Sequence, residues 1–198
     1  MNALTLLYLF AIQVLISYAD DDLEMAPYDV IKTTETYEER HYPARKWVST
    51  MSYSISYDDC TSDLFHKLFD YIDGGNDQGI KIAMTSPVTT FVQPGAGPNC
   101  ESNFTMSFLV PEVHTAAPPA PTNPDVFIEE RPDLASVFAR QFGGFAFEDD
   151  YIREAAALAF DLTSSGEDGV NYDNWYIVNY NDPYAIVNRR NEVWFLRP

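Results

Sequence analysis

Two similar stretches of sequence lie about 90 residues apart in this chain, and such a repeat strongly limits how the chain can fold. The first contains Glu38-Glu39-Arg40 and ends on the strand-like run 103–111, and the second contains Glu129-Glu130-Arg131 and ends on the run 191–198. Each half-unit is too small to bury much surface alone. The repeat therefore predicts that both halves pack into one pseudo-symmetric domain. A groove between the halves would be a natural place for a ligand.

The half-units are expected at about residues 28–115 and 125–198. Residues 116–124 contain four prolines and no periodic apolar pattern. This composition predicts an extended, exposed linker between the halves.

The first 19 residues have the features of a signal peptide. Leu4 to Ile16 is apolar except for Thr5 and Gln13, and Ser17-Tyr18-Ala19 then precedes three aspartates. Small residues at positions 17 and 19 fit the cleavage rule, which predicts a cut after Ala19 and a single secreted domain over residues 20–198. An uncleaved anchor is the alternative. The apolar run is short for a membrane span, and no other segment is long and apolar enough to cross one.

The chain is strongly acidic, with 30 Asp and Glu residues against 12 Lys and Arg and a formal net charge of -18. This balance argues against binding nucleic acid or an anionic membrane, because both need a basic face. The hydrophobic fraction of 46%, with 13 Phe and 13 Tyr, supports a well-buried core.

Two cysteines and one sequon suggest modifications typical of secreted proteins. An even number of cysteines in an exported chain predicts a disulfide between Cys60 and Cys100. The bond would close a loop of about 40 residues, worth about 4 kcal/mol in the chain-entropy description. A pair of free buried thiols is the alternative. Asn103-Phe104-Thr105 is the only glycosylation sequon and makes Asn103 a candidate for a glycan.

The apolar periodicity predicts an α+β fold built on an antiparallel sheet. A helix is expected at 64–72 after an N-cap at Ser62-Asp63, and an alanine-rich helix at 149–162. The expected strands cover residues 28–33, 36–42, 44–54, 80–92 with a break at Pro87, 104–110, 126–130, 135–142, 175–180, 185–187 and 193–196.

Few motifs of catalysis are present. The chain has no phosphate loop, dinucleotide fingerprint, nucleophile elbow or metal-spaced His/Cys cluster. Its three histidines are His41, His66 and His114, and none lies at helical spacing from a second candidate ligand. In so acidic a chain no single carboxylate pair stands out. The sequence therefore favours binding over catalysis, and the chain is not expected to be an enzyme.

Several ordered motifs resemble the SOUL heme-binding protein family, and most closely its heme-binding protein 2 branch. They are the run Arg40 to Thr50, the pattern from Phe65 to Asn76, Lys81 to Thr89, Asp125 to Glu129, and Asn188 to Trp194. The likeness extends from about residue 28 to residue 198. It implies a twisted antiparallel β-barrel flanked by two helices and built from a pseudo-two-fold repeat.

The same resemblance implies binding of heme or another tetrapyrrole by a secreted, non-catalytic carrier or scavenger. An axial histidine has been proposed in the Arg-His-Tyr motif of some members, which here is His41. Other members are thought to hold heme by apolar contacts alone. Members are largely intracellular, so the predicted signal peptide is a departure.

The candidate site residues follow from this implied function. Arg40, Lys46 and Lys81 are the cationic candidates for the heme propionates, and Phe65, Leu68 and Phe69 belong to an apolar helical arc that could line the groove. The simpler interpretation makes the arc core and His41 an exposed strand residue. His66 and His114 are expected at the surface.

Two other function classes remain open. One is a secreted interaction or structural protein that uses the scaffold without heme. The other is an enzyme acting on a small apolar molecule. A visible absorbance band on adding hemin would separate the heme binder from the interaction protein.

Overall fold

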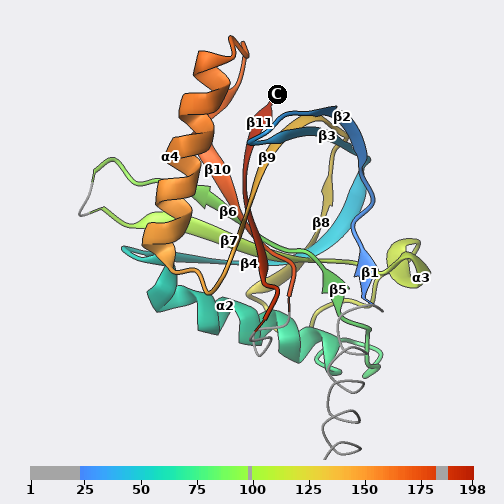
Figure 1. Cartoon of the computed structure of the whole chain (residues 1–198). Helices are drawn as coiled ribbons and strands as arrows, with labels where there is room; N and C mark the ends of the chain where they lie inside the picture. The colour runs from blue at the N-terminus through green and yellow to red at the C-terminus, as the bar shows by residue number, and fades with distance from the viewer. Residues whose placement is uncertain (1–22, 98–99, 182–186) are drawn as a thin grey trace, which may run out of the picture.

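One large antiparallel sheet and two long helices make up the fold (Figure 1). The computed structural model describes residues 23–97, 100–181 and 187–198, so the predicted signal peptide lies outside the described residues. The strands are β1 (Glu24–Met25), β2 (Asp29–Thr33), β3 (Glu38–Tyr42), β4 (Arg45–Ser54), β5 (Thr85–Ser86), β6 (Val88–Gln93), β7 (Ser102–Leu109), β8 (Val126–Arg131), β9 (Leu134–Gly143), β10 (Asn171–Asn179) and β11 (Arg190–Arg197). The helices are α2 (Tyr57–Ile72), α3 (Glu112–Thr115) and α4 (Glu148–Ser164).

The main sheet contains nine strands in the order β2-β3-β9-β11-β10-β6-β7-β4-β8, and every neighbouring pair is antiparallel. The predicted α+β class with an antiparallel sheet is thus confirmed. Among the described residues the sheet keeps two edges, β2 and β8, and does not close on itself. The barrel implied by the family resemblance is therefore not confirmed. The sheet instead curls into an open arch (Figure 1).

Apart from the edge strand β2, the strand order is the same from both ends once strands of the two half-units are matched. β9, β11 and β10 lie on one side of the centre, and β4, β7 and β6 occupy the equivalent places on the other. β3 pairs with β9 of the other half, as β8 pairs with β4. A pseudo-two-fold repeat would produce this order, but the repeat itself stays a prediction.

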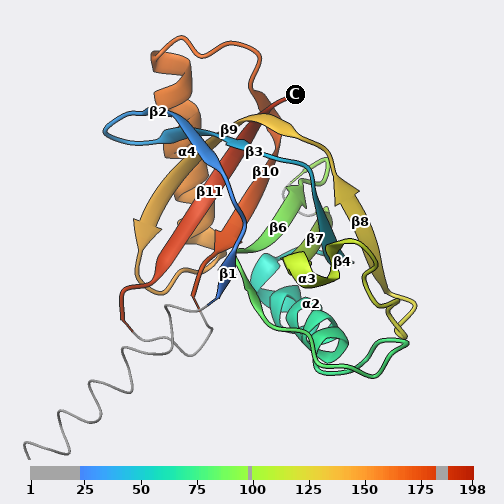
Figure 2. The same ribbon diagram turned by 90° about the vertical axis from the view of Figure 1, so that its right-hand side faces the viewer.

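Each long helix packs against its own part of the sheet (Figure 2). α2 lies on β4 and β7, and α4 lies on β9, β10 and β11. The buried stripes that face the sheet contain Leu64 and Leu68 in α2, and Leu158 and Leu162 in α4. Their spacing of four residues places each pair on one helix face, as the periodicity predicted.

The predicted start of the first helix, at residue 64, was wrong by two turns. α2 begins after Ser56, whose side-chain oxygen accepts a hydrogen bond from the Asp58 backbone N–H at 3.2 Å. Asp58 and Asp59 then occupy the first turn, where the helix dipole favours negative charge. These acidic residues have no apolar period, so the pattern alone did not reveal that turn.

The opposite face of the sheet, here called the inner face, is also buried. Along β10 and β11 the side chains alternate strictly. Ile177 and Val193 face the helices, whereas Tyr176, Val178 and Trp194 belong to a second apolar cluster on the inner face. The arch of the sheet and the segment around Ala26 cover this cluster. Its other members are Tyr42, Trp47, Leu109, Val137, Ala139 and Tyr180.

The predicted disulfide is not present in the structure, and both cysteines are free. The thiol of Cys60 points into the core from the first turns of α2, where its Sγ lies 3.5 Å from the Tyr57 carbonyl oxygen. Cys100 is exposed in the connection between β6 and β7. Burial raises the pKa of the Cys60 thiol to about 11, which opposes the thiolate needed for disulfide chemistry. The prediction failed because a count of cysteines carries no information on their placement.

Some smaller elements escaped the sequence analysis. β1 and the one-turn helix α3 were not expected, since two- to four-residue elements leave no periodic signal. β5 and β6 are the two short strands on either side of the break predicted at Pro87. The expected strand at 185–187 falls largely outside the described residues. The proline-rich linker is held to the loop after α2, where the Asp77 and Thr122 N–H groups donate to the carbonyls of Ala120 and Gly75 at 2.8 and 3.1 Å.

Candidate functional site

A buried carboxylate, Glu192, lies at the centre of the inner face. Its side chain has no exposed surface. It accepts two N–H groups of Arg40 at 2.8 and 3.1 Å, the Tyr180 hydroxyl at 3.0 Å and the Trp194 indole N–H at 2.7 Å. Arg190 adds a further contact to Oε1 at 2.6 Å. Glu192 is thus fully occupied by donors.

The charge of this carboxylate is fixed by its neighbours. Burial by itself would raise the pKa of Glu192, but the hydrogen bonds and charge of Arg40 and the charge of Arg190 lower it below the ordinary value. Burial raises the pKa of Tyr42, beside Arg40, to about 12. Glu192 therefore stays ionised and held in place by its hydrogen bonds, which suits a structural ion pair better than a residue that transfers protons.

A second arginine lies on the same face. The guanidinium of Arg131 lies 4.3 Å from the ring centroid of Trp47, and its Nε donates to Glu129 at 2.9 Å. Its terminal nitrogens donate to the hydroxyls of Thr89 and Ser107. Like Arg40, it makes hydrogen bonds and an aromatic contact, so neither arginine presents an open cationic site.

The inner face is closely packed around Trp47, whereas a more open hollow of about 240 Å³ lies beside Tyr180 and Arg190. The cavity next to Trp47, Arg131, Tyr176 and Trp194 holds about 20 Å³, roughly room for one water molecule. Ligand sites for small organic molecules are commonly about 300–1,000 Å³. Beside Trp47 the expected groove between the half-units is therefore filled by aromatic and arginine side chains, and a porphyrin does not fit in that cavity.

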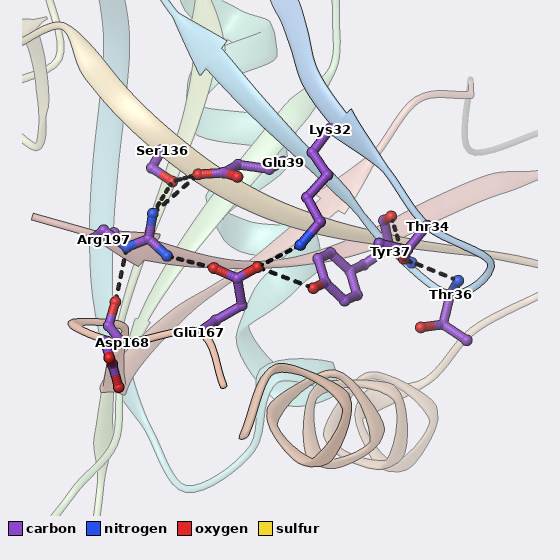
Figure 3. Close-up of polar contacts among 9 residues, drawn as sticks. All are labelled: Lys32, Thr34, Thr36, Tyr37, Glu39, Ser136, Glu167, Asp168 and Arg197. Atoms are coloured by element: carbon purple, nitrogen blue, oxygen red, sulfur yellow. Dashed lines mark hydrogen bonds and ion pairs between the residues drawn. The ribbon is translucent and has the colours of Figure 1, made fainter. Parts of the chain in front are cut away.

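A polar network links β2, the loop after α4 and β11 at one end of the sheet (Figure 3). Glu167, in the loop after α4, accepts hydrogen bonds from Lys32 of β2 and from Arg197 of β11, both at 2.7 Å, and from the Tyr37 hydroxyl at 3.3 Å. The hydrogen bond from Lys32 is the largest cause that lowers the pKa of Glu167. Arg197 also contacts Glu39, at 3.1 Å. This network ties the β2–β3 hairpin to the other half-unit and is structural.

His41, the predicted iron ligand, projects from β3 away from its neighbours Arg40 and Tyr42, because alternate side chains leave a strand on opposite faces. Its Nε2 lies 2.9 Å from both carboxylate oxygens of Asp133, and its Nδ1 lies 3.6 Å from Asp29. The hydrogen bond to Asp133 is the largest cause that raises the pKa of His41. Both ring nitrogens thus face carboxylates.

The predicted cationic residues do not gather in one place. Arg40 is buried against Glu192. Lys46 lies on β4 opposite Glu130 of β8. Lys81 is exposed and forms an ion pair at 2.7 Å with Asp73, the residue that ends α2. Of the three, only Lys81 lies beside the helix that contains the predicted apolar residues.

The predicted apolar residues of α2 separate into core and surface. Leu68 is fully buried in the core. Phe65 and Phe69 stack on each other with ring centroids 6.0 Å apart and planes 19° apart, and Phe69 is 43% exposed. Phe65 also packs edge-on against the buried Phe108, with ring centroids 5.4 Å apart. The stack therefore reaches from the core at Phe65 to the surface at Phe69, whereas Leu68 belongs to the core alone.

His66 lies beside this aromatic pair, although the sequence analysis expected only a solvent-facing residue there. Its ring is 6.3 Å from that of Phe65, and its Nδ1 lies 2.6 Å from the Ser62 carbonyl oxygen. The spacing of three residues between His66 and Phe69 was the signal that could have found it, since such residues are neighbours on a helix surface.

The remaining site predictions concern a glycan, a metal ion and a membrane span. The Asn103 side-chain amide nitrogen, which a glycan would need, donates to Gln93 at 3.0 Å within the β6–β7 ladder. In the part of the chain that the structure describes, no cluster of three His, Cys, Asp or Glu side chains is arranged to hold a metal ion. Over the same residues no helix is long and apolar enough to span a membrane.

Comparison with known proteins gives a consistent result over nearly the whole described chain. The family model described as SOUL heme-binding protein matches residues 23–196. Human heme-binding protein 2 is 41% identical over 174 residues, covering 87% of this chain and 83% of that protein. Mouse heme-binding protein 2 is 38% identical, covering 90% and 88%. Heme-binding protein 1 of Xenopus tropicalis is 33% identical, covering 81% and 83%.

Solved structures share the fold at much lower identity. The C-terminal domain of EcmrR superposes with a TM-score of 0.58 at 8% identity, covering 85% of this chain and 96% of that one. A hydrolase from Listeria innocua gives 0.52 at 10% identity, covering 84% and 93%. At such identities these likenesses concern the fold alone.

Proposed function

The chain belongs to the SOUL heme-binding protein family, and on that premise we propose that it binds heme or a related tetrapyrrole as an exported, non-catalytic carrier or scavenger. The observation that carries the proposal is the family match over residues 23–196, which leaves little of the described chain outside it. Relatives at 31–41% identity are named as heme-binding proteins, which favours binding over turnover.

The surface of α2 fits a porphyrin better than the inner face does. A porphyrin needs a flat apolar contact surface, cationic groups near its propionates and, for iron ligation, a nitrogen lone pair. The exposed Phe69 ring, stacked on the partly buried Phe65, offers the apolar surface, and Lys81 offers a cation beside the end of the helix. Bound heme would supply iron chemistry; the chain's residues would hold it and limit the access of water.

The role of His41 as axial ligand stays a prediction. An iron ligand must present a deprotonated nitrogen. The raised pKa of His41 and the carboxylates facing both of its nitrogens oppose this role, so coordination would have to break the contact with Asp133 or displace Asp29.

A hemin titration tests the proposed function. Hemin added to residues 20–198 should produce a saturable Soret band and quench tryptophan fluorescence, with half-saturation at micromolar hemin or below. Apomyoglobin is the positive control, and a similarly acidic non-binding protein measures nonspecific adsorption. A linear, non-saturating response equal to that of the acidic control would favour the interaction-protein alternative instead.

Export is a separate part of the proposal and rests on the apolar run Leu4 to Ile16 with small residues at Ser17 and Ala19. Expressed in secretory cells with its native N-terminus, the protein collected from the medium should begin at Asp20. Retention in the cells, or an intact Met1 on the released protein, would contradict export by cleavage.

A further inference from the structure

The orientation of the His66 ring leaves one of its nitrogens available. Its Nδ1 lies 2.6 Å from the backbone carbonyl oxygen of Ser62, one helical turn earlier. A carbonyl oxygen can only accept, so Nδ1 carries the hydrogen and Nε2 carries the lone pair of the neutral ring. Within the described residues no hydrogen bond is made to Nε2.

This arrangement matches the usual state of a metal-bound histidine. Such a histidine donates its non-ligating N–H to a carbonyl or carboxylate, which fixes the tautomer and the direction of the other nitrogen. His41 differs, because the nearest groups to both of its nitrogens are carboxylates. Of these two histidines, His66 is the one already held in the tautomer that ligation requires.

A partly exposed aromatic pair adjoins the His66 ring. Phe65 and Phe69 stack one turn apart on α2, and the His66 ring stands at 87° to Phe65. Single exposed apolar residues are common on protein surfaces, but a stacked pair beside a free imidazole nitrogen offers an apolar contact and a ligand together. A planar aromatic macrocycle that carries a metal is the ligand class that uses both.

The charges around this surface can adapt to an anionic ligand. Lys67 Nζ lies 3.1 Å from Asp63 and 3.4 Å from Asp125, and Lys81 pairs with Asp73. Asp70 is exposed on the same helix and would repel a carboxylate. Exposed ion pairs of this kind contribute about 0–1 kcal/mol, so either lysine can turn to a propionate at little cost.

We propose that His66 Nε2 is an axial ligand of the heme iron and that the porphyrin contacts the Phe65–Phe69 stack. The inference rests on the proposed heme-binding function and names the ligand and the surface that serve it. It differs from the family-based expectation, which assigns the iron to His41.

Histidine variants of residues 20–198 test the proposal by hemin titration. His66→Ala should shift the Soret band toward that of hemin without a nitrogen ligand and weaken binding at least about tenfold. Imidazole added to the His66→Ala protein should restore the wild-type spectrum, which loss of a structural contact would not explain. His114→Ala is the matched control and should keep the wild-type spectrum and affinity. His41→Ala tests the competing assignment, and the proposal expects it to leave both unchanged.

The possible outcomes separate the two proposals. If wild-type protein binds no hemin, the proposed function itself fails. If wild-type protein binds hemin and His66→Ala has the same spectrum and affinity, heme binding stands and the assignment to His66 is overturned. A change confined to His41→Ala would return the ligand to β3. Thermal unfolding of each variant confirms that the exposed substitutions leave the fold intact.

Discussion

Replacing Glu192 by alanine should lower the free energy of unfolding by about 3–5 kcal/mol, because it removes the buried partner of Arg40 and leaves this arginine only its ion pair with the partly exposed Glu38. Arg40, itself buried, would lose both N–H contacts to the carboxylate. The Tyr180 hydroxyl and the Trp194 indole N–H would lose their acceptor as well. Urea unfolding followed by tryptophan fluorescence measures the change.

Glu112→Ala is the matched control for this prediction. Glu112 also pairs with an arginine, Arg45, at 3.0 Å, but its side chain is 68% exposed. Removal of such a surface pair should cost no more than about 1 kcal/mol. Equal, small effects of both substitutions would show that the Glu192 cluster does not stabilise the fold. If Glu192→Ala does not fold, Trp194→Phe removes one donor and should still cost about 1.5–3 kcal/mol.

Two neighbouring residues of α2 should respond very differently to truncation. Leu68→Ala should cost about 2–5 kcal/mol of stability, since it opens a cavity between α2 and the sheet where the side chain is fully buried. Phe69→Ala removes a half-exposed ring from its stack on Phe65 and should cost about 1 kcal/mol or less. Thermal and urea unfolding of the two variants measure this contrast.

The variants Leu68→Ala and Phe69→Ala also distinguish a core residue from a residue of the binding surface. Phe69→Ala should weaken hemin binding while the fold stays stable, whereas Leu68→Ala should reduce stability first. Strong destabilisation by Phe69→Ala would place that ring in the core and remove it from the binding surface.

The sequence predicted those parts of the fold that have a local period. The stripe of Leu64 and Leu68 indicated a helix, and the apolar run 193–196 indicated a strand, although its two distinct faces became visible only in the fold. The first turns of α2 were missed, because Asp58 and Asp59 are stabilised there by the helix dipole and by the Ser56 cap.

The buried polar network could not be read from a local pattern. Glu192 and Arg40 are 152 positions apart in the sequence and meet only because β3 pairs with β9 beside β11. The same limit applies to the cysteines, whose even number suggested a bond that the fold does not make. His66 looked like an ordinary surface residue until its hydrogen bond to Ser62 fixed the direction of its ring.

The position of the bound porphyrin tests the proposed binding surface on α2 most directly. A titration with zinc protoporphyrin, which is diamagnetic, followed by two-dimensional ¹H–¹⁵N NMR, locates the site residue by residue. We expect saturable shifts concentrated in the turns of α2 that contain Phe65, His66 and Phe69, with the β11 amides around Glu192 and Trp194 little changed. Shifts centred on Glu192 and Trp194, or no saturable shifts at all, would contradict porphyrin binding on the surface of α2.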